Sequence, residues 1–223
     1  MKYTVYILRH GRTWFNTYDK MQGWSDSPLT TEGTAVAERA AQQLKDVPFD
    51  LAISSDARRA IDTCRLITSA NVNHQTLIPQ KSPRFREEFY GYFEGMNSTE
   101  TWHMVLAPHG FGSFNEAAQE VGLDQTKDWM KAADPFHDAE DAHEYWQRLE
   151  AGFNDLDQLA FDGAKILLVS HGTTIRSLAE RFGDGSFEVT TGPQNSSLTT
   201  LVREDGQNVV TSYNQTLDND SSN

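Results

Sequence analysis

The chain begins with an apolar strand that runs directly into a His-Gly turn, YTVYILRHGRT at residues 3–13. The same pattern returns near the other end, KILLVSHGTT at residues 165–174. In open α/β sheets, ligands bind in the crevice at the carboxyl ends of parallel strands. The two motifs therefore predict that His10 and His171 share one pocket. Imidazole changes its protonation state near neutral pH, and the glycine after each histidine leaves backbone room for a ligand.

The segments between and after these motifs alternate between strand and helix patterns, which is typical of an α/β protein. We expect a helix capped at Thr30 or Thr31, a strand over 50–54, a helix over 56–68, a strand over 76–79, a long helix over 145–160, a helix over 173–182 and a closing hairpin over 199–203 and 208–213. Residues 96–140 interrupt this order and predict a lid insertion. The predicted fold is three-layer α/β/α, with a mostly parallel central sheet and a helical lid.

Composition predicts a globular protein with one domain over residues 1–213 and a disordered polar tail over 214–223. The formal net charge of -13 argues against nucleic acid and anionic membrane as partners, because both need a clustered basic face. Since no secretory signal or long apolar stretch is present, we expect a cytoplasmic protein. Cys64 is the only cysteine, which excludes an internal disulfide, and its apolar helical pattern predicts a core position. The oligomeric state stays unknown.

Arginines accompany the predicted strand ends. Arg9 directly precedes His10, and Arg58 and Arg59 open the helix after the second strand. Guanidinium groups match phosphate oxygens and stay charged at any working pH. In phosphoryl transfer the charge spreads over three equatorial oxygens, so catalysis is mainly positioning and cationic stabilisation. Two arginines and two histidines can supply this without a metal ion or another cofactor.

These residues resemble the motifs of the histidine phosphatase superfamily, which has the phosphoglycerate mutase-like fold. The motifs are LRHGRT at 8–13 with Asn16, SSDARRA at 54–60, EEFYGYFEG at 87–95 and VSHG at 169–172, and the resemblance covers residues 1–213. It implies that His10 is the nucleophile that becomes a phosphohistidine. It also implies that Arg9, Arg59 and His171 complete the phosphate pocket, and that Asn16, Gln22, Gly23 and Gly172 contact the substrate. Arg59 is the match because it directly precedes Ala60, and Arg58 is expected to be solvated.

The resemblance also points to the proton donor. The group that protonates a leaving alkoxide and later takes a proton from water is typically a carboxylic acid with a raised pKa. The family places its glutamate four residues before a glycine, and four residues before Gly91 is Glu87. We therefore expect Glu87 to be catalytic, Glu88 to be a solvated loop carboxylate and Glu94 to be structural.

The insertion offers two further readings. His137 and His143 stand in an acidic run but are six residues apart, which does not place them on one helix face, so we expect no metal site there. Its aromatic residues line an apolar substrate site or form the core of the insertion, and both alternatives stay open. These residues are Trp102, Phe111, Phe114, Trp129 and Phe136.

Two reactions are compatible with the resemblance, because mutases keep the phosphohistidine for a second acceptor whereas phosphatases admit water. The mutases carry an arginine directly after the acid and basic residues in the insertion. Here Glu88 follows Glu87, and residues 96–146 hold two lysines against ten acidic side chains. These acidic side chains would then repel a second anionic group on the substrate.

We therefore expect a metal-independent phosphomonoester phosphatase acting on a small phosphorylated metabolite, with phosphoglycerate mutase as the alternative. A non-catalytic phosphate-binding module has no need of the Glu87 carboxyl.

Overall fold

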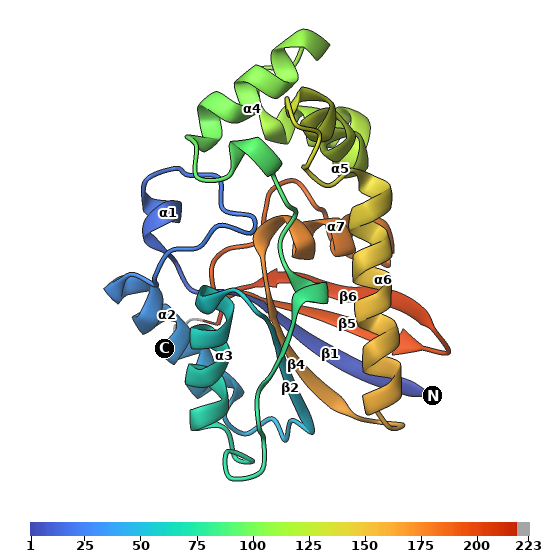
Figure 1. Ribbon diagram of the computed structural model, residues 1–223. Coiled ribbons are helices and arrows are strands. Elements are labelled where there is room, and N and C mark those ends of the chain that lie inside the picture. The colour runs from blue at the N-terminus through green and yellow to red at the C-terminus, as the bar shows by residue number, and fades with distance from the viewer. Residues whose placement is uncertain (218–223) are drawn as a thin grey trace.

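The computed structural model describes residues 1–217, and its centre is one six-stranded sheet with the strand order β3-β2-β4-β1-β5-β6 (Figure 1). The strands are β1 (Lys2–Arg9), β2 (Leu51–Ser55), β3 (Gln80–Ser82), β4 (Lys165–Ser170), β5 (Leu198–Glu204) and β6 (Gln207–Gln215). The pairs β1–β4, β4–β2 and β2–β3 are parallel, whereas the pairs β1–β5 and β5–β6 are antiparallel. The predicted mostly parallel sheet is confirmed.

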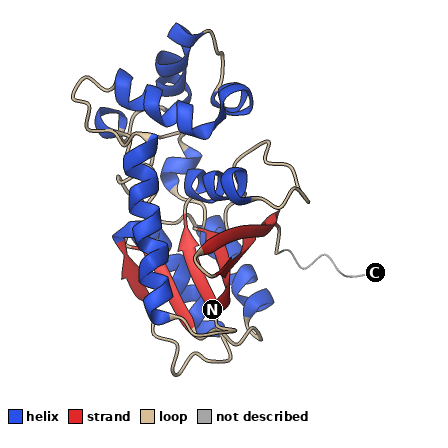
Figure 2. Cartoon of the chain, turned by 90° about the vertical axis from the view of Figure 1, so that its right-hand side faces the viewer, coloured by secondary structure: helices blue, strands red, loops and turns tan. Residues whose placement is uncertain are grey.

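Helices cover both faces of this sheet (Figures 1 and 2). On one face lie α2 (Thr31–Leu44) and α3 (Arg58–Ala70), and on the other lie α6 (Ala142–Leu159) and α7 (Gly172–Phe182). Strand β4 is apolar from Ile166 to Val169 because this stretch contributes to both cores. Ile166 and Leu168 pack with α6 and α7, while Leu167 and Val169 pack with α2 and α3. The three-layer prediction is confirmed, and Cys64 is buried in the second core as expected.

The predicted insertion forms a separate helical layer beyond α7, at the top of Figure 1. It contains α4 (Ser98–Leu106) and α5 (Phe114–Ala133), which is kinked at Gly122. Shorter helical turns comprise α1 (Trp14–Thr17), η1 (Pro83–Phe85), η2 (Gly91–Phe93) and η3 (Ala107–His109). Leu106, Ala117 and Met130 of this layer pack with Met21 and Phe93, so the lid core is a third hydrophobic cluster that also includes residues outside the insertion.

Two sequence-based expectations are corrected by the structure. The strand predicted over 76–79 is wrong, because the N–H groups of Thr76 and Leu77 close a turn on the carbonyl of Asn73, and β3 follows at 80–82. Ile78, which lies within the predicted strand, is 77% exposed. Strand β6 extends to Gln215, so the tail predicted from residue 214 begins inside a strand, and residues 218–223 lie outside the described part. Within residues 1–217, no helix is long and apolar enough to span a membrane.

Candidate active site

Strands β1 and β4 are direct neighbours, and Arg9 lies opposite Ser170 in their register. The next residues along the two strands, His10 and His171, therefore emerge side by side. The backbone N–H of His10 donates to the carbonyl of Ser170 at 3.0 Å, and the two imidazole centroids are 5.2 Å apart. The predicted proximity of the two imidazoles is confirmed.

The hydrogen bonding of His10 assigns its tautomer. Its Nδ1 lies 2.8 Å from the carbonyl oxygen of Gly11, which can only accept, so Nδ1 carries the proton and Nε2 carries the lone pair. Burial, followed by the positive charges of Arg59 and Arg9, holds the pKa of His10 well below its usual value. The ring is therefore neutral at neutral pH, which is the form that a nucleophile requires.

His171 and Arg59 lie fully enclosed behind His10. Nη2 of Arg59 is 3.0 Å from Nδ1 of His171, so that imidazole keeps its proton on Nε2 and donates to Ser55 at 2.7 Å. Burial and the Arg59 charge hold the pKa of His171 well below its usual value. Arg59 also donates to the carbonyls of Gln22 and Gly23 and forms an ion pair with Asp26. Direct contact of either residue with a substrate stays a prediction.

A cavity of about 250 Å³ opens between these strand ends and the lid. Six of the predicted site residues line it, namely Arg9, His10, Asn16, Gln22, Glu87 and Gly172, whereas Arg59, His171 and Gly23 do not. The lid contributes Ser98, Trp102, Phe114 and Asn115. Trp102 and Phe114 stack on each other at 4.2 Å, while Phe111 and Trp129 pack on the lid core and Phe136 is exposed. Trp102 and Phe114 thus line the cavity and also pack in the lid core, whereas Phe111 and Trp129 belong to that core alone.

The start of α7 holds Glu87 in a fixed position. One carboxylate oxygen accepts the backbone N–H of Thr173 at 2.8 Å, and the other accepts the N–H and the hydroxyl of Thr174, each at 2.9 Å. A helix N-terminus favours a carboxylate because its first N–H groups point outward and carry partial positive charge. Glu87 therefore faces the same cavity as His10.

Glu88 differs from the solvated loop carboxylate that was expected, and that expectation is wrong. Its side chain is completely buried, and neither carboxylate oxygen accepts a hydrogen bond from the described chain. Burial raises its pKa to about 8, although the buried ammonium of Lys127 opposes the shift. The same loop directs the side chain of Glu87 toward the cavity and the side chain of Glu88 into the protein interior. Glu94, in contrast, is structural as expected, because it accepts the N–H groups of Gly23, Trp24 and Ser25.

Several residues of the cavity were not anticipated from the sequence. Tyr90, Lys20, Thr173 and Arg176 line it. Arg176 could have been found from its spacing, because it lies three residues after Thr173 and so shares a helix face with it. None of the ten acidic residues of 96–146 lines the cavity. The charge count of the insertion is therefore no measure of the charge that a substrate meets.

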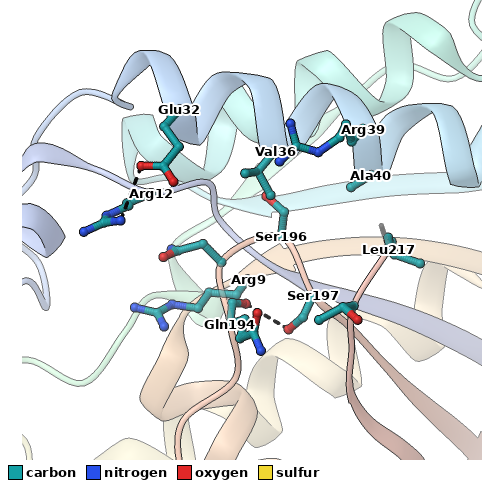
Figure 3. A pocket seen from close by; sticks show the side chains of 12 residues that line it. Arg9, Arg12, Glu32, Val36, Arg39, Ala40, Gln194, Ser196, Ser197 and Leu217 are labelled. Atoms are coloured by element: carbon teal, nitrogen blue, oxygen red, sulfur yellow. Dashed lines mark hydrogen bonds and ion pairs between the residues drawn. The ribbon is translucent and has the colours of Figure 1, made fainter. Parts of the chain in front are cut away.

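A second pocket of about 310 Å³ lies on the α2 side of Arg9 (Figure 3). Arg12 and Glu32 face each other across one part of it as an ion pair of 3.3 Å. His10, Glu87 and His171 are not among its lining residues, and Arg9 is the one described residue that lines both pockets. In the part of the chain that the structure describes, no group of three or more His, Cys, Asp or Glu side chains is arranged to hold a metal ion.

Comparison with known proteins agrees with this arrangement. A family model described as the histidine phosphatase superfamily (branch 1) matches residues 5–216. A 2,3-bisphosphoglycerate-dependent phosphoglycerate mutase of Rhizobium etli is 30% identical over 181 residues, which cover 79% of this chain and 78% of that protein. The crystal structure of a phosphoglycerate mutase from Bacillus anthracis str. Sterne is 34% identical, with a TM-score of 0.88 over 96% of this chain and 94% of that one.

The fold extends to more distant proteins. A mycobacterial glucosyl-3-phosphoglycerate phosphatase has a TM-score of 0.69 at 23% identity, over 96% of this chain and 100% of the other. The motif order, the adjacent histidines and the family match over nearly the whole chain lead to one conclusion. The chain is an enzyme of the histidine phosphatase superfamily, branch 1.

Proposed function

We propose that this enzyme is a metal-independent phosphatase that hydrolyses the phosphomonoester of a small metabolite through a phosphohistidine on His10. One arrangement carries the proposal. The neutral imidazole of His10, the guanidinium of Arg9 and the carboxyl group of Glu87 line one cavity of about 250 Å³. This set provides a nucleophile, a cation for the phosphoryl oxygens and a proton carrier.

In the first step, Nε2 of His10 attacks phosphorus and the bond from phosphorus to the ester oxygen breaks. Glu87 takes up the proton that a phosphomonoester monoanion brings into the cavity and gives it to that oxygen, and the alcohol leaves. In the second step, water attacks the phosphohistidine while Glu87 takes a proton from it, which releases inorganic phosphate and restores the imidazole. Arg9 stabilises the oxygens in both steps. Arg59 holds the neutral ring of His171 beside His10 and adds positive potential behind the nucleophile.

The position after Glu87 supports hydrolysis. The resemblance places an arginine there in mutases, but Glu88 is enclosed and does not line the cavity. A second candidate function is phosphoryl transfer between hydroxyls of one metabolite. Lys20 and Arg176 favour it, because they give the cavity cations beyond Arg9 that could hold a second acidic group. The names of the relatives that are 30% and 34% identical also favour it.

Purified enzyme, incubated with p-nitrophenyl phosphate and a panel of phosphorylated metabolites, distinguishes these functions. The panel includes 3-phosphoglycerate with 2,3-bisphosphoglycerate as primer, and ³¹P NMR follows the products. We expect inorganic phosphate as the main product, and its loss in His10→Ala. Formation of 2-phosphoglycerate faster than phosphate release would identify a mutase. No turnover of any ester would leave a binding module as the better description.

A further inference from the structure

The three buried arginines of the described chain differ in their counterions. Arg59 pairs with Asp26 at 3.0 Å, and Arg203 pairs with Asp157 at 2.6 Å. Arg176 is 2% exposed and forms no ion pair with any residue of 1–217. Because burying a charge without a counterion is costly, an arginine in this state needs an explanation.

All direct partners of Arg176 are neutral. Nη1 donates to the side-chain oxygen of Asn115 at 2.8 Å, Nη2 donates to the carbonyl of Thr190 at 2.9 Å, and the guanidinium carbon lies 5.4 Å from the Phe114 ring centroid. These contacts fix the direction of the guanidinium without an ion pair. Glu180, one helical turn further on, acts on it only at a distance, because its carboxylate accepts the N–H of Leu123. Burial lowers the pKa of Arg176, yet a guanidinium stays protonated in proteins.

The location of Arg176 suggests what compensates this charge. It lines the same cavity as His10 and lies one helical turn beyond Thr173, which binds Glu87. Arg9, which lines the cavity as well, donates to the carbonyl of Pro193 and also forms no ion pair within the described residues. One cavity thus holds two guanidinium groups that form no ion pair, whereas the buried arginines elsewhere are paired. Glu87 is the only carboxyl group among the described residues that line this cavity; it attracts Arg9 at a distance and is hydrogen-bonded to the start of α7. Arg9 is adjacent to His10, so the phosphate accounts for only one of the two guanidinium groups.

We infer that Arg176 binds a second anionic group of the substrate, a carboxylate or a second phosphate on a small phosphomonoester. The inference rests on the proposed function for the position of the first phosphate at His10 and Arg9. It reverses the expectation that the site repels a second anionic group. That expectation counted the acidic residues of 96–146, none of which lines the cavity. The bound anion would form charge-assisted hydrogen bonds with Arg176 and so provide the ion pair that Arg176 does not form with any described residue.

Three non-hydrolysable phosphonates of equal chain length test this without relying on turnover. They are propylphosphonate, 3-phosphonopropanoate and propane-1,3-diphosphonate, and calorimetry gives their dissociation constants. We expect one of the two doubly anionic compounds to bind at least about tenfold more tightly than propylphosphonate, since hydrogen bonds to charged groups have this magnitude. The tighter of the two identifies carboxylate or phosphate as the second group. Equal binding of all three compounds would overturn the inference.

Substitutions test whether the preference for a doubly anionic compound depends on Arg176. Arg176→Gln should remove the preference for the doubly anionic compound while propylphosphonate binds within about threefold of wild type. Arg176→Lys, which keeps the charge without the fork, should retain part of the preference and covers the case in which the glutamine variant does not fold. Arg181→Gln is the matched control, because Arg181 is half-exposed on the same helix and lines a different pocket. An undiminished preference in folded Arg176→Gln would also overturn the inference. Hydrolysis of p-nitrophenyl phosphate, measured separately, tests the proposed function.

Discussion

The buried carboxyl of Glu88 should make the stability of this protein fall as pH rises. Its pKa is raised from 4.5 to about 8, mainly by burial. The folded state therefore binds this proton more tightly than the unfolded state does. The resulting stabilisation is fully present below pH 4.5 and is lost as pH rises toward 8. At about 1.4 kcal/mol for each pKa unit, the whole loss is at most about 5 kcal/mol.

Glutamine has nearly the shape of glutamic acid and does not titrate, so Glu88→Gln isolates this loss. Between pH 5 and pH 8, the free energy of unfolding of the variant relative to wild type should increase by about 3 kcal/mol. Urea unfolding at pH 5, 6, 7 and 8 measures this difference, and other titrating groups cancel in it. Glu38→Gln, on the exposed face of α2, is the matched control and should show no such trend.

Parallel stability curves for wild type and Glu88→Gln would refute the reasoning, because they would mean that Glu88 has the same protonation in both states. A constant offset between such parallel curves would measure only the contribution of the side chain to packing. An increase that appears in Glu38→Gln as well would point to the net charge of -13.

Four further predictions concern the chemistry. Glu87→Gln should slow hydrolysis of an alkyl phosphate by about a hundredfold to ten-thousandfold but slow hydrolysis of p-nitrophenyl phosphate far less, because nitrophenolate leaves without a proton. Glu88→Gln should leave both rates nearly unchanged. If the dependence on the leaving group appeared in Glu88→Gln instead, the acid would be Glu88. His10→Ala should abolish hydrolysis and the acid-labile phosphate that rapid quench traps on wild type; activity within tenfold of wild type would contradict the nucleophile. In an NMR titration, the lowered pKa of His10 should keep its ring neutral as pH falls from 8 to 6, whereas protonation centred near 6.5 would contradict its burial among arginines. Activity should persist in excess EDTA, and loss that one divalent ion restores would require a metal site.

The sequence by itself determined the parts of this protein that depend on local pattern. Ile166 to Val169 are apolar at every position, which predicts a strand buried on both faces, and the structure places them between two helical layers. Asp205 and Gly206 predict a tight hairpin, and both adopt positive φ angles, 50° and 82°, as the turn between β5 and β6 requires. The adjacency of His10 and His171 also follows from sequence, because parallel strands bring their carboxyl ends to one edge.

Only the tertiary structure decided which side chains meet across the lid and the helices. The spacing to Gly91 favoured Glu87 over Glu88 as the acid, but nothing in the local sequence indicated that Glu88 is buried near Lys127. Arg176 reads as an ordinary helical arginine until Asn115, sixty-one residues earlier, is found against it. The ten acidic residues of 96–146 suggested a repelling lid, yet they point elsewhere. Charge and burial at a site depend on contacts distant in sequence, which composition does not contain.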